Sequence, residues 1–295
     1  MQAKDIRWIH VELSSKCNAW CPECRRNNKG FGLAEDLVEQ DLPTSRLIEV
    51  VEQLPNLEVL QLCGNYGDPL AAHNINDVVD YAVSKNVKIQ IHTNGSLRNT
   101  TWWSSLGQQL KDYKHDVCFG IDGLEGTHEI YRQGTSFTKI IDNAKAFIQS
   151  GGYATWQFIP YAHNEHQTKD CFKMSHQLGF KKFKLADFSR TPISTPVHHY
   201  KTGAVFELKP PQQKLMFMMK PISKTKTSMA VDPKDCVYLN IPSVYLAANG
   251  KLNTCCHYGF PEFQQYDTLN EVFDQPVDLT RTKCITACGF VQSQM

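Results

Sequence analysis

Short apolar runs alternate with amphipathic stretches along the first 187 residues, and this alternation limits the folds open to the chain. The apolar runs have the length of strands, and the stretches between them carry apolar residues at helical spacing. Parallel strands need a crossover connection, which is usually a helix. The pattern therefore predicts an α/β fold with six βα units, built as an open doubly wound sheet or as a partial barrel. The predicted strands cover residues 8–13, 59–62, 87–92, 117–121, 154–160 and 182–185.

The alternation ends near residue 188, where prolines and basic residues become frequent. Farther along the chain, Asn249 and Gly250 lie between two apolar runs, which predicts a β-hairpin with a tight turn. These changes divide the chain into three parts. The predicted parts are a barrel over residues 1–187, a linker or flap over 188–235 and a small hairpin-containing domain over 236–295.

Charge and cysteine content narrow the function classes. Lys and Arg number 31 against 30 Asp and Glu, so the balance does not favour a nucleic-acid clamp. No apolar run approaches the length of a membrane span, and the start of the chain shows no cleavage pattern. We therefore expect a cytoplasmic protein without membrane partners. Eleven cysteines in a reducing compartment indicate metal binding or catalysis rather than disulfides.

The first cysteine group follows the first predicted strand. Cys17, Cys21 and Cys24 have C-x3-C-x2-C spacing and lie where α/β proteins place their chemistry. Three thiolates hold three corners of a cubane iron–sulfur cluster and leave one iron open, whereas structural zinc takes four protein ligands. A zinc site completed by His10 or His92, or three thiols without a shared ligand, remains an alternative.

Residues 17–24, together with the segment Gly-Asn-Tyr-Gly-Asp-Pro at 64–69, resemble the radical S-adenosylmethionine (SAM) enzymes. The resemblance implies that the open iron of a 4Fe–4S cluster binds the amino and carboxylate groups of SAM. It also implies that segment 64–69 receives the amino group. The residue types in this segment are suited to that role, because glycines let backbone carbonyls approach an ammonium group and the Asp68 carboxylate complements its charge. The alternative is an ordinary turn with a solvated Asp68.

The ends of the third and fourth predicted strands extend the resemblance. By resemblance, Gly120 and Asp122 face the ribose of SAM, and Arg132 pairs with its carboxylate. Relatives often carry Ser at the position of Gly120, so a side-chain contact to the ribose is missing there. The predicted SAM-binding residues are Tyr66, Gly67, Asp68, Thr93, Asn94, Gly120, Asp122 and Arg132.

The second cysteine group lies in the last 60 residues. Cys236 is followed after thirteen residues by Gly250, and Cys255 comes after four more. This spacing is similar to the auxiliary-cluster extensions called SPASM and, in shorter form, twitch. The resemblance implies one auxiliary 4Fe–4S cluster and leaves Cys256 spare, since adjacent strand residues point to opposite faces. A four-thiolate zinc knuckle is the alternative. The predicted ligands are Cys236, Cys255, Cys284 and Cys288.

Together the motifs are typical of a partial (βα)6 TIM-type barrel followed by an auxiliary-cluster domain. The implied enzyme is a radical SAM oxidoreductase, which cleaves SAM to a 5′-deoxyadenosyl radical that abstracts hydrogen from a small polar molecule or a peptide. A flavodoxin- or ferredoxin-like protein would supply electrons. The auxiliary cluster would accept one from the substrate radical, giving dehydrogenation or cross-linking.

Three other functions stay open on sequence alone. A redox-neutral epimerase would use Cys256 as its hydrogen donor. An electron carrier would need no open iron, and a zinc-binding interaction protein would need no catalysis. His163 and Glu165, just past the fifth predicted strand, are candidates for proton transfer to a substrate.

Overall fold

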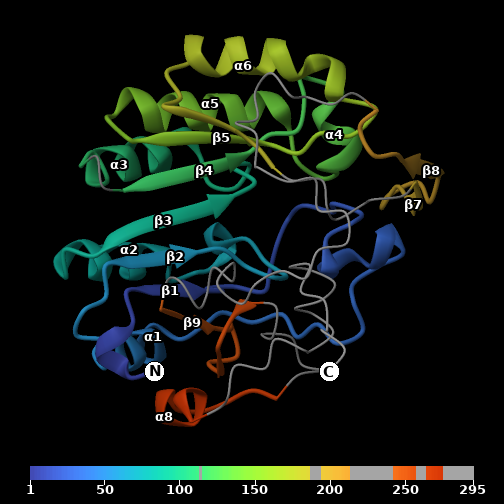
Figure 1. The fold of residues 1–295 in the computed structure, drawn as a ribbon. Helices are drawn as coiled ribbons and strands as arrows, with labels where there is room; N and C mark the ends of the chain where they lie inside the picture. Colours follow the sequence, from blue (N-terminus) through green and yellow to red (C-terminus); the bar gives the residue numbers. More distant parts are fainter. Residues whose placement is uncertain (113–114, 187–193, 213–241, 257–263, 275–295) are drawn as a thin grey trace, which may run out of the picture.

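The computed structural model describes residues 1–112, 115–186, 194–212, 242–256 and 264–274. The strands are β1 (Trp8–Val11), β2 (Val59–Leu62), β3 (Lys88–Thr93), β4 (Asp116–Gly120), β5 (Ala154–Phe158), β6 (Lys182–Leu185), β7 (Thr195–His198), β8 (Val205–Leu208), β9 (Ser243–Leu246) and β10 (Leu252–Asn253). Eight of these described strands form one open sheet in the order β10-β9-β1-β2-β3-β4-β5-β6 (Figure 1). β1 to β6 run parallel, and β7 pairs with β8 in a separate ribbon.

Helices connect the parallel strands. The α-helices are α1 (Thr44–Val51), α2 (Ile75–Ser84), α3 (Thr100–Gln109), α4 (His128–Tyr131), α5 (Phe137–Gln149), α6 (Thr168–Gln177) and α8 (Leu269–Phe273). Short 3-10 helices are η1 (Ala3–Asp5), η2 (Arg25–Gly30), η3 (Pro69–Ala71) and η4 (Glu165–Gln167). Caps set several starts: the Asn99 side chain accepts from the Trp102 amide at α3, and Ser136 accepts from Lys139 at α5. These helices provide the crossovers that a parallel sheet requires.

The two faces of the parallel sheet differ in polarity. One face joins the helices in a single apolar core, in which α2 buries Val78 and Val79 and α5 buries Ile140 and Ala144. Parallel strands that are packed on both faces consist of continuous apolar residues, whereas apolar and polar residues alternate along these strands. The opposite face therefore meets polar surroundings, and it is the face available for a ligand. Its central side chains are His10, Gln61, His92, Cys118 and Gln157.

The predicted α/β fold and its six βα strands are confirmed, with boundaries within two residues of the prediction. The predicted hairpin is present as β9 and β10, and it extends the barrel sheet because β9 pairs in parallel with β1. Its turn spans residues 248–250 rather than two residues, with Gly250 at φ +81°. The three-part division of the chain stays a prediction.

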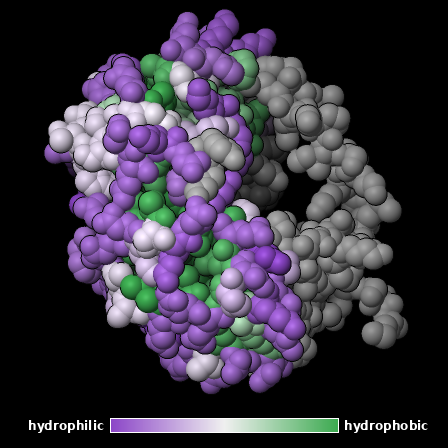
Figure 2. Space-filling model, turned by 90° about the vertical axis from the view of Figure 1, so that its left-hand side faces the viewer, coloured by the Kyte–Doolittle hydropathy of each residue, from purple (hydrophilic) through white to green (hydrophobic). Residues whose placement is uncertain are grey.

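Figure 2 shows the side of the molecule where the strands of Figure 1 begin. Hydrophilic residues cover most of the described surface there, and hydrophobic ones show between them. None of the helices in the described ranges combines the length and the apolar character needed to cross a bilayer.

Candidate functional site

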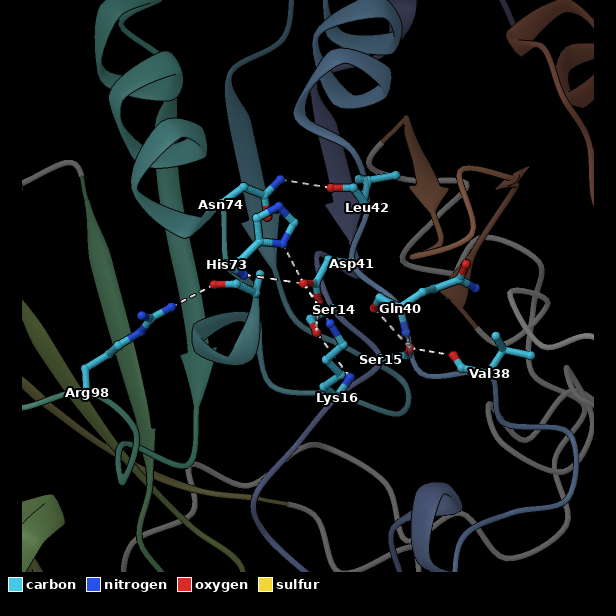
Figure 3. Close-up of polar contacts among 11 residues, drawn as sticks. Ser14, Ser15, Lys16, Val38, Gln40, Asp41, Leu42, His73, Asn74 and Arg98 are labelled. Atoms are coloured by element: carbon cyan, nitrogen blue, oxygen red, sulfur yellow. Dashed lines mark hydrogen bonds and ion pairs between the residues drawn. The ribbon is translucent and has the colours of Figure 1, made fainter.

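The start of the cysteine loop is held by a second loop, residues 38–42 (Figure 3). The Ser15 amide donates to the Gln40 carbonyl at 3.0 Å, and the Ser15 hydroxyl donates to the Val38 carbonyl at 2.7 Å. Next to these bonds, Ser14 and Asp41 form an isolated antiparallel bridge. The cysteine loop therefore leaves the sheet from a fixed point.

Asp41 completes this support. It accepts from the Ser14 hydroxyl at 2.6 Å and from Lys16 Nζ at 2.9 Å, and His73 Nδ1 lies 2.7 Å from its Oδ2 (Figure 3). Burial acts to raise the pKa of Asp41, but hydrogen bonds from His73, Ser14 and Lys16 outweigh it and lower the pKa to about 2. Asp41 is thus ionised at neutral pH and bridges three segments of the chain.

The three predicted cluster cysteines share one wall of a cavity of about 420 Å³, and their thiols lie close enough to interact electrostatically. The Ala19 amide donates to Cys17 Sγ at 3.3 Å, and Asn94 Nδ2 donates to the same sulfur at 3.7 Å. Burial raises the pKa of Cys17, and that of Cys21 to about 11, so metal binding must displace protons. Donors aimed at sulfur are suited to thiolates that ligate a cluster.

The cavity collects most of the residues predicted to bind SAM. Its volume lies within the range of small-molecule sites, and it opens at the carboxyl ends of the parallel strands. The structure therefore brings together side chains from four strand ends that are far apart in sequence. The predicted residues in its wall are Cys17, Cys21, Cys24, Tyr66, Gly67, Asp68, Thr93, Asn94, Gly120 and Arg132.

Asp68 anchors the β2 and β3 side of the cavity. Its buried carboxylate accepts from the Leu70 amide at 3.0 Å, from the Asn94 amide at 2.7 Å and from the Thr93 hydroxyl at 2.9 Å. Burial is the largest influence and raises the pKa of Asp68 despite these donors. In the described part of the chain no Lys or Arg forms an ion pair with Asp68. Asp68 therefore supplies carboxyl oxygens to this side of the wall.

Arg132 supplies the opposite charge on the β4 side. Its Nε donates to Asp122 Oδ2 at 2.6 Å, and its Nη1 lies 4.0 Å from Cys21 Sγ. A Cβ at Gly120 would lie only 2.7 Å from Arg132 Nη2. The absence of a side chain at Gly120 therefore leaves room for the guanidinium beside the end of β4. Asp122 also accepts from the Ile159 amide at 2.7 Å. Arg132 is thus held in the wall with a fixed orientation.

Asp122 differs from its predicted place. The side chain is fully buried, and both carboxylate oxygens are used by Arg132 and the Ile159 amide rather than facing the cavity. A carboxylate so engaged positions an arginine and has no oxygen turned to a ribose. Tyr66 lines the cavity, but its hydroxyl donates to Asp36 Oδ2 at 2.7 Å.

Comparisons with known proteins bear on this architecture. No protein-family profile matches the chain. The antilisterial bacteriocin subtilosin biosynthesis protein AlbA of Bacillus subtilis (strain 168) is 27% identical over 187 residues, which are 61% of this chain and 39% of AlbA. The chain thus matches about two fifths of the length of that curated relative.

Solved structures match over a longer span. Streptococcus suis SuiB bound to S-adenosylmethionine superposes with a TM-score of 0.66 at 13% identity, covering 93% of this chain and 67% of SuiB. SuiB bound to the precursor peptide SuiA gives a TM-score of 0.65 at 14% identity, covering 93% and 66%. This chain and SuiB therefore share a fold over most of this chain.

Several residues of the cavity wall were not predicted to bind a cluster or SAM. Among them are Cys63, His92, Cys118 and Gln157. Burial lowers the pKa of His92 to about 4, so its ring is neutral, and Cys118 Sγ donates to Gln157 Oε1 at 3.3 Å. Their shared position on the polar face of alternating strands was the available signal.

His163 and Glu165 are not among the residues that line this cavity. The His163 ring stacks on Tyr161 at 5.5 Å, and burial, with a smaller effect of His166, lowers its pKa to about 4. Glu165 is buried at the start of η4. The role of these two residues in proton transfer stays a prediction.

Of the predicted auxiliary ligands, only Cys255 falls within the described residues, where it is buried. Cys236, Cys284 and Cys288 lie outside them. β10 ends at Asn253, so Cys255 and Cys256 follow the strand and the argument from strand alternation loses its basis. The choice between these two cysteines stays a prediction.

Proposed function

We propose that this protein is a radical SAM enzyme that acts on a peptide. The supporting observation is the single cavity that combines three cysteine thiols with opposite charges on two sides. Cys17, Cys21 and Cys24 fit a 4Fe–4S cluster, because three thiols share one wall and N–H donors point at one of the sulfurs. When bound, the cluster supplies the electron that cleaves SAM to methionine and a 5′-deoxyadenosyl radical, which abstracts hydrogen from the substrate.

The wall residues orient SAM through charge. Arg132 carries a permanent positive charge, so it attracts the carboxylate of SAM. Asp68 and the carbonyls of the Gly64–Gly67 turn lie on the other side, where an ammonium lowers the free energy of the buried carboxylate. Because the two charges are fixed in position, they select one orientation of the amino-acid end of SAM.

The polar face of the sheet supports a polar substrate beside SAM. His92 and Gln157 offer neutral hydrogen-bonding groups at the cavity wall. SuiB has been crystallised with the precursor peptide SuiA, and AlbA serves bacteriocin biosynthesis. These likenesses favour a peptide over the small polar molecule that was the other expectation.

We further propose an oxidative outcome. An auxiliary 4Fe–4S cluster held by the C-terminal cysteines would accept an electron from the substrate radical, giving an unsaturated or cross-linked product. A flavodoxin- or ferredoxin-like protein would reduce the first cluster. A cytoplasmic location remains part of this proposal.

The test is anaerobic reconstitution with iron and sulfide, followed by reduction in the presence of SAM. We expect 5′-deoxyadenosine and methionine in the product mixture, detected by mass spectrometry, and none from Cys17→Ala. Colourless protein that retains stoichiometric zinc under the same conditions would support a zinc-binding interaction protein instead.

A further inference from the structure

Glu12 is a buried carboxylate that the proposed chemistry does not use. It follows directly after β1 and is 2% exposed. Its Oε1 accepts from the Tyr66 amide at 2.6 Å and from the Gly67 amide at 3.2 Å. Burying a carboxylate is costly unless its lone pairs are satisfied, so these amides are tied to Glu12. Glu12 therefore fixes the backbone of the segment proposed to receive the amino group of SAM.

The second oxygen of Glu12 leads to the C-terminal part of the chain. Tyr245, on β9, donates its hydroxyl to Glu12 Oε2 at 3.0 Å. Asn65 Nδ2 donates both to that hydroxyl at 3.1 Å and to the Cys256 carbonyl at 2.8 Å. A continuous series of hydrogen bonds thus joins the cysteine-bearing loop after β10 to the segment of residues 64–67.

Little free space surrounds this junction. A Cβ at Gly64 would lie 2.9 Å from Glu12 Oε1 and 2.5 Å from the Gly67 carbonyl oxygen. A Cβ at Gly67 would overlap the Ser14 carbonyl at the start of the cysteine loop. Displacement of the Glu12 carboxylate must therefore move segment 64–67 against the loop that holds the first cysteine group.

We propose that Glu12 and Tyr245 are positioning residues that couple the C-terminal cysteine loop to the SAM-binding segment, an inference that rests on the proposed radical SAM function. The Cys256 carbonyl holds Asn65, and Asn65 and Tyr245 hold Glu12 against the two amides. Coupling of this kind is reciprocal, so SAM binding also stabilises the loop that bears Cys256.

Tyr245→Phe tests the coupling, because it removes one hydroxyl and keeps the buried ring. In reconstituted protein we expect the Kd for SAM to rise about 5- to 50-fold, since a buried carboxylate loses a donor. Iron content should stay unchanged. In metal-free protein, hydrogen exchange at the Tyr66 and Gly67 amides should accelerate. Glu12→Gln should give a larger rise in Kd, and it replaces Tyr245→Phe as the test if that variant does not fold.

The matched control is Tyr81→Phe on α2. It removes an exposed hydroxyl that donates to the Glu52 carboxylate at 2.9 Å. This variant should leave the Kd for SAM and the amide exchange unchanged.

The outcomes separate the coupling from the function beneath it. Unchanged SAM affinity and unchanged amide exchange in Tyr245→Phe and Glu12→Gln, with wild-type protein binding SAM, overturn the coupling alone. Wild-type protein that holds iron but binds no SAM overturns the proposed function and the coupling with it.

Discussion

Two sides of the cavity each bury a carboxylate at a strand end, but they satisfy it in opposite ways. At the end of β2, Asp68 accepts from two backbone amides and the Thr93 hydroxyl, all of which are uncharged. At the end of β4, Asp122 pairs with the Arg132 guanidinium. The first side holds an acid among uncharged donors, whereas the second holds an arginine in the wall.

The difference shows how partners determine the role of a buried acid. Asp68 lines the cavity and forms no ion pair with a Lys or Arg of the described residues, so it is suited to a cationic group of a ligand. Asp122 lies behind the wall and acts on a ligand only through Arg132. Substitutions on the two sides should therefore have different consequences.

Among substitutions in the cavity, replacing one of the three cysteines that lie between the β2 and β4 sides should have the largest effect on activity. Cys21→Ala should lose about four irons per chain and all detectable 5′-deoxyadenosine formation, since three thiolates are needed to hold the cluster. Cys171→Ala is the matched control, because Cys171 is a fully buried thiol in the apolar core. Iron analysis and product detection give the readout. Full iron content in Cys21→Ala would exclude Cys21 as a ligand.

On the β4 side, Asp122→Asn should lower the free energy of unfolding by about 3–5 kcal/mol, because it leaves a buried guanidinium without its partner. SAM binding should weaken as well, since Arg132 loses its fixed orientation. Urea unfolding and a SAM titration measure the two effects. A loss below about 1 kcal/mol would show that Arg132 is solvated and that the two sides do not differ in this way.

On the β2 side, Asp68→Asn should cost less stability, about 1–3 kcal/mol, because the lost hydrogen bonds involve uncharged donors. Its effect on SAM should nonetheless be direct, as the charge that faces the ammonium is removed. The same unfolding and binding experiments apply. If Asp68→Asn binds SAM as tightly as the wild type, the ammonium lies elsewhere.

The smallest effect concerns Asp41, outside the cavity. Its folded pKa of about 2 lies below the ordinary value of 3.8, so its stabilising contribution is present above about pH 4 and is lost as the pH falls toward 2. The contribution should be about 1 kcal/mol, since solvent screens the exposed His73 and Lys16. Unfolding curves at several pH values should show this loss, and Asp41→Asn should remove it. Equal acid sensitivity in both proteins would contradict the assignment.

Local patterns were sufficient to predict the strands and the location of the site. Apolar runs identify β1 to β6, and the carboxyl ends of parallel strands must meet, which places Cys17, Asp68 and Arg132 around one cavity. The alternation within β4 also placed Cys118 on the polar face. The position of Cys118 on this face could be inferred from the sequence, but its many apolar neighbours favoured a core position instead.

The contacts between residues far apart in the chain could not be predicted from the sequence. The contact between Glu12 and Tyr245 joins residues 233 positions apart, and no spacing rule predicts that β9 pairs beside β1. The Arg132 side chain meets Asp122 only because α4 turns the chain back over the end of β4. Sequence placed these acids at strand ends, but the partners that determine their roles come from the fold.

The most direct test of the cluster and its charged surroundings is electron–nuclear double resonance on the reduced, reconstituted protein with SAM labelled with ¹⁵N at its amino group. Binding of SAM to an open iron beside Asp68 predicts a hyperfine coupling from that nitrogen, weakened in Asp68→Asn and absent in Cys21→Ala. A reduced cluster whose spectrum shows no nitrogen coupling at saturating SAM would contradict the account.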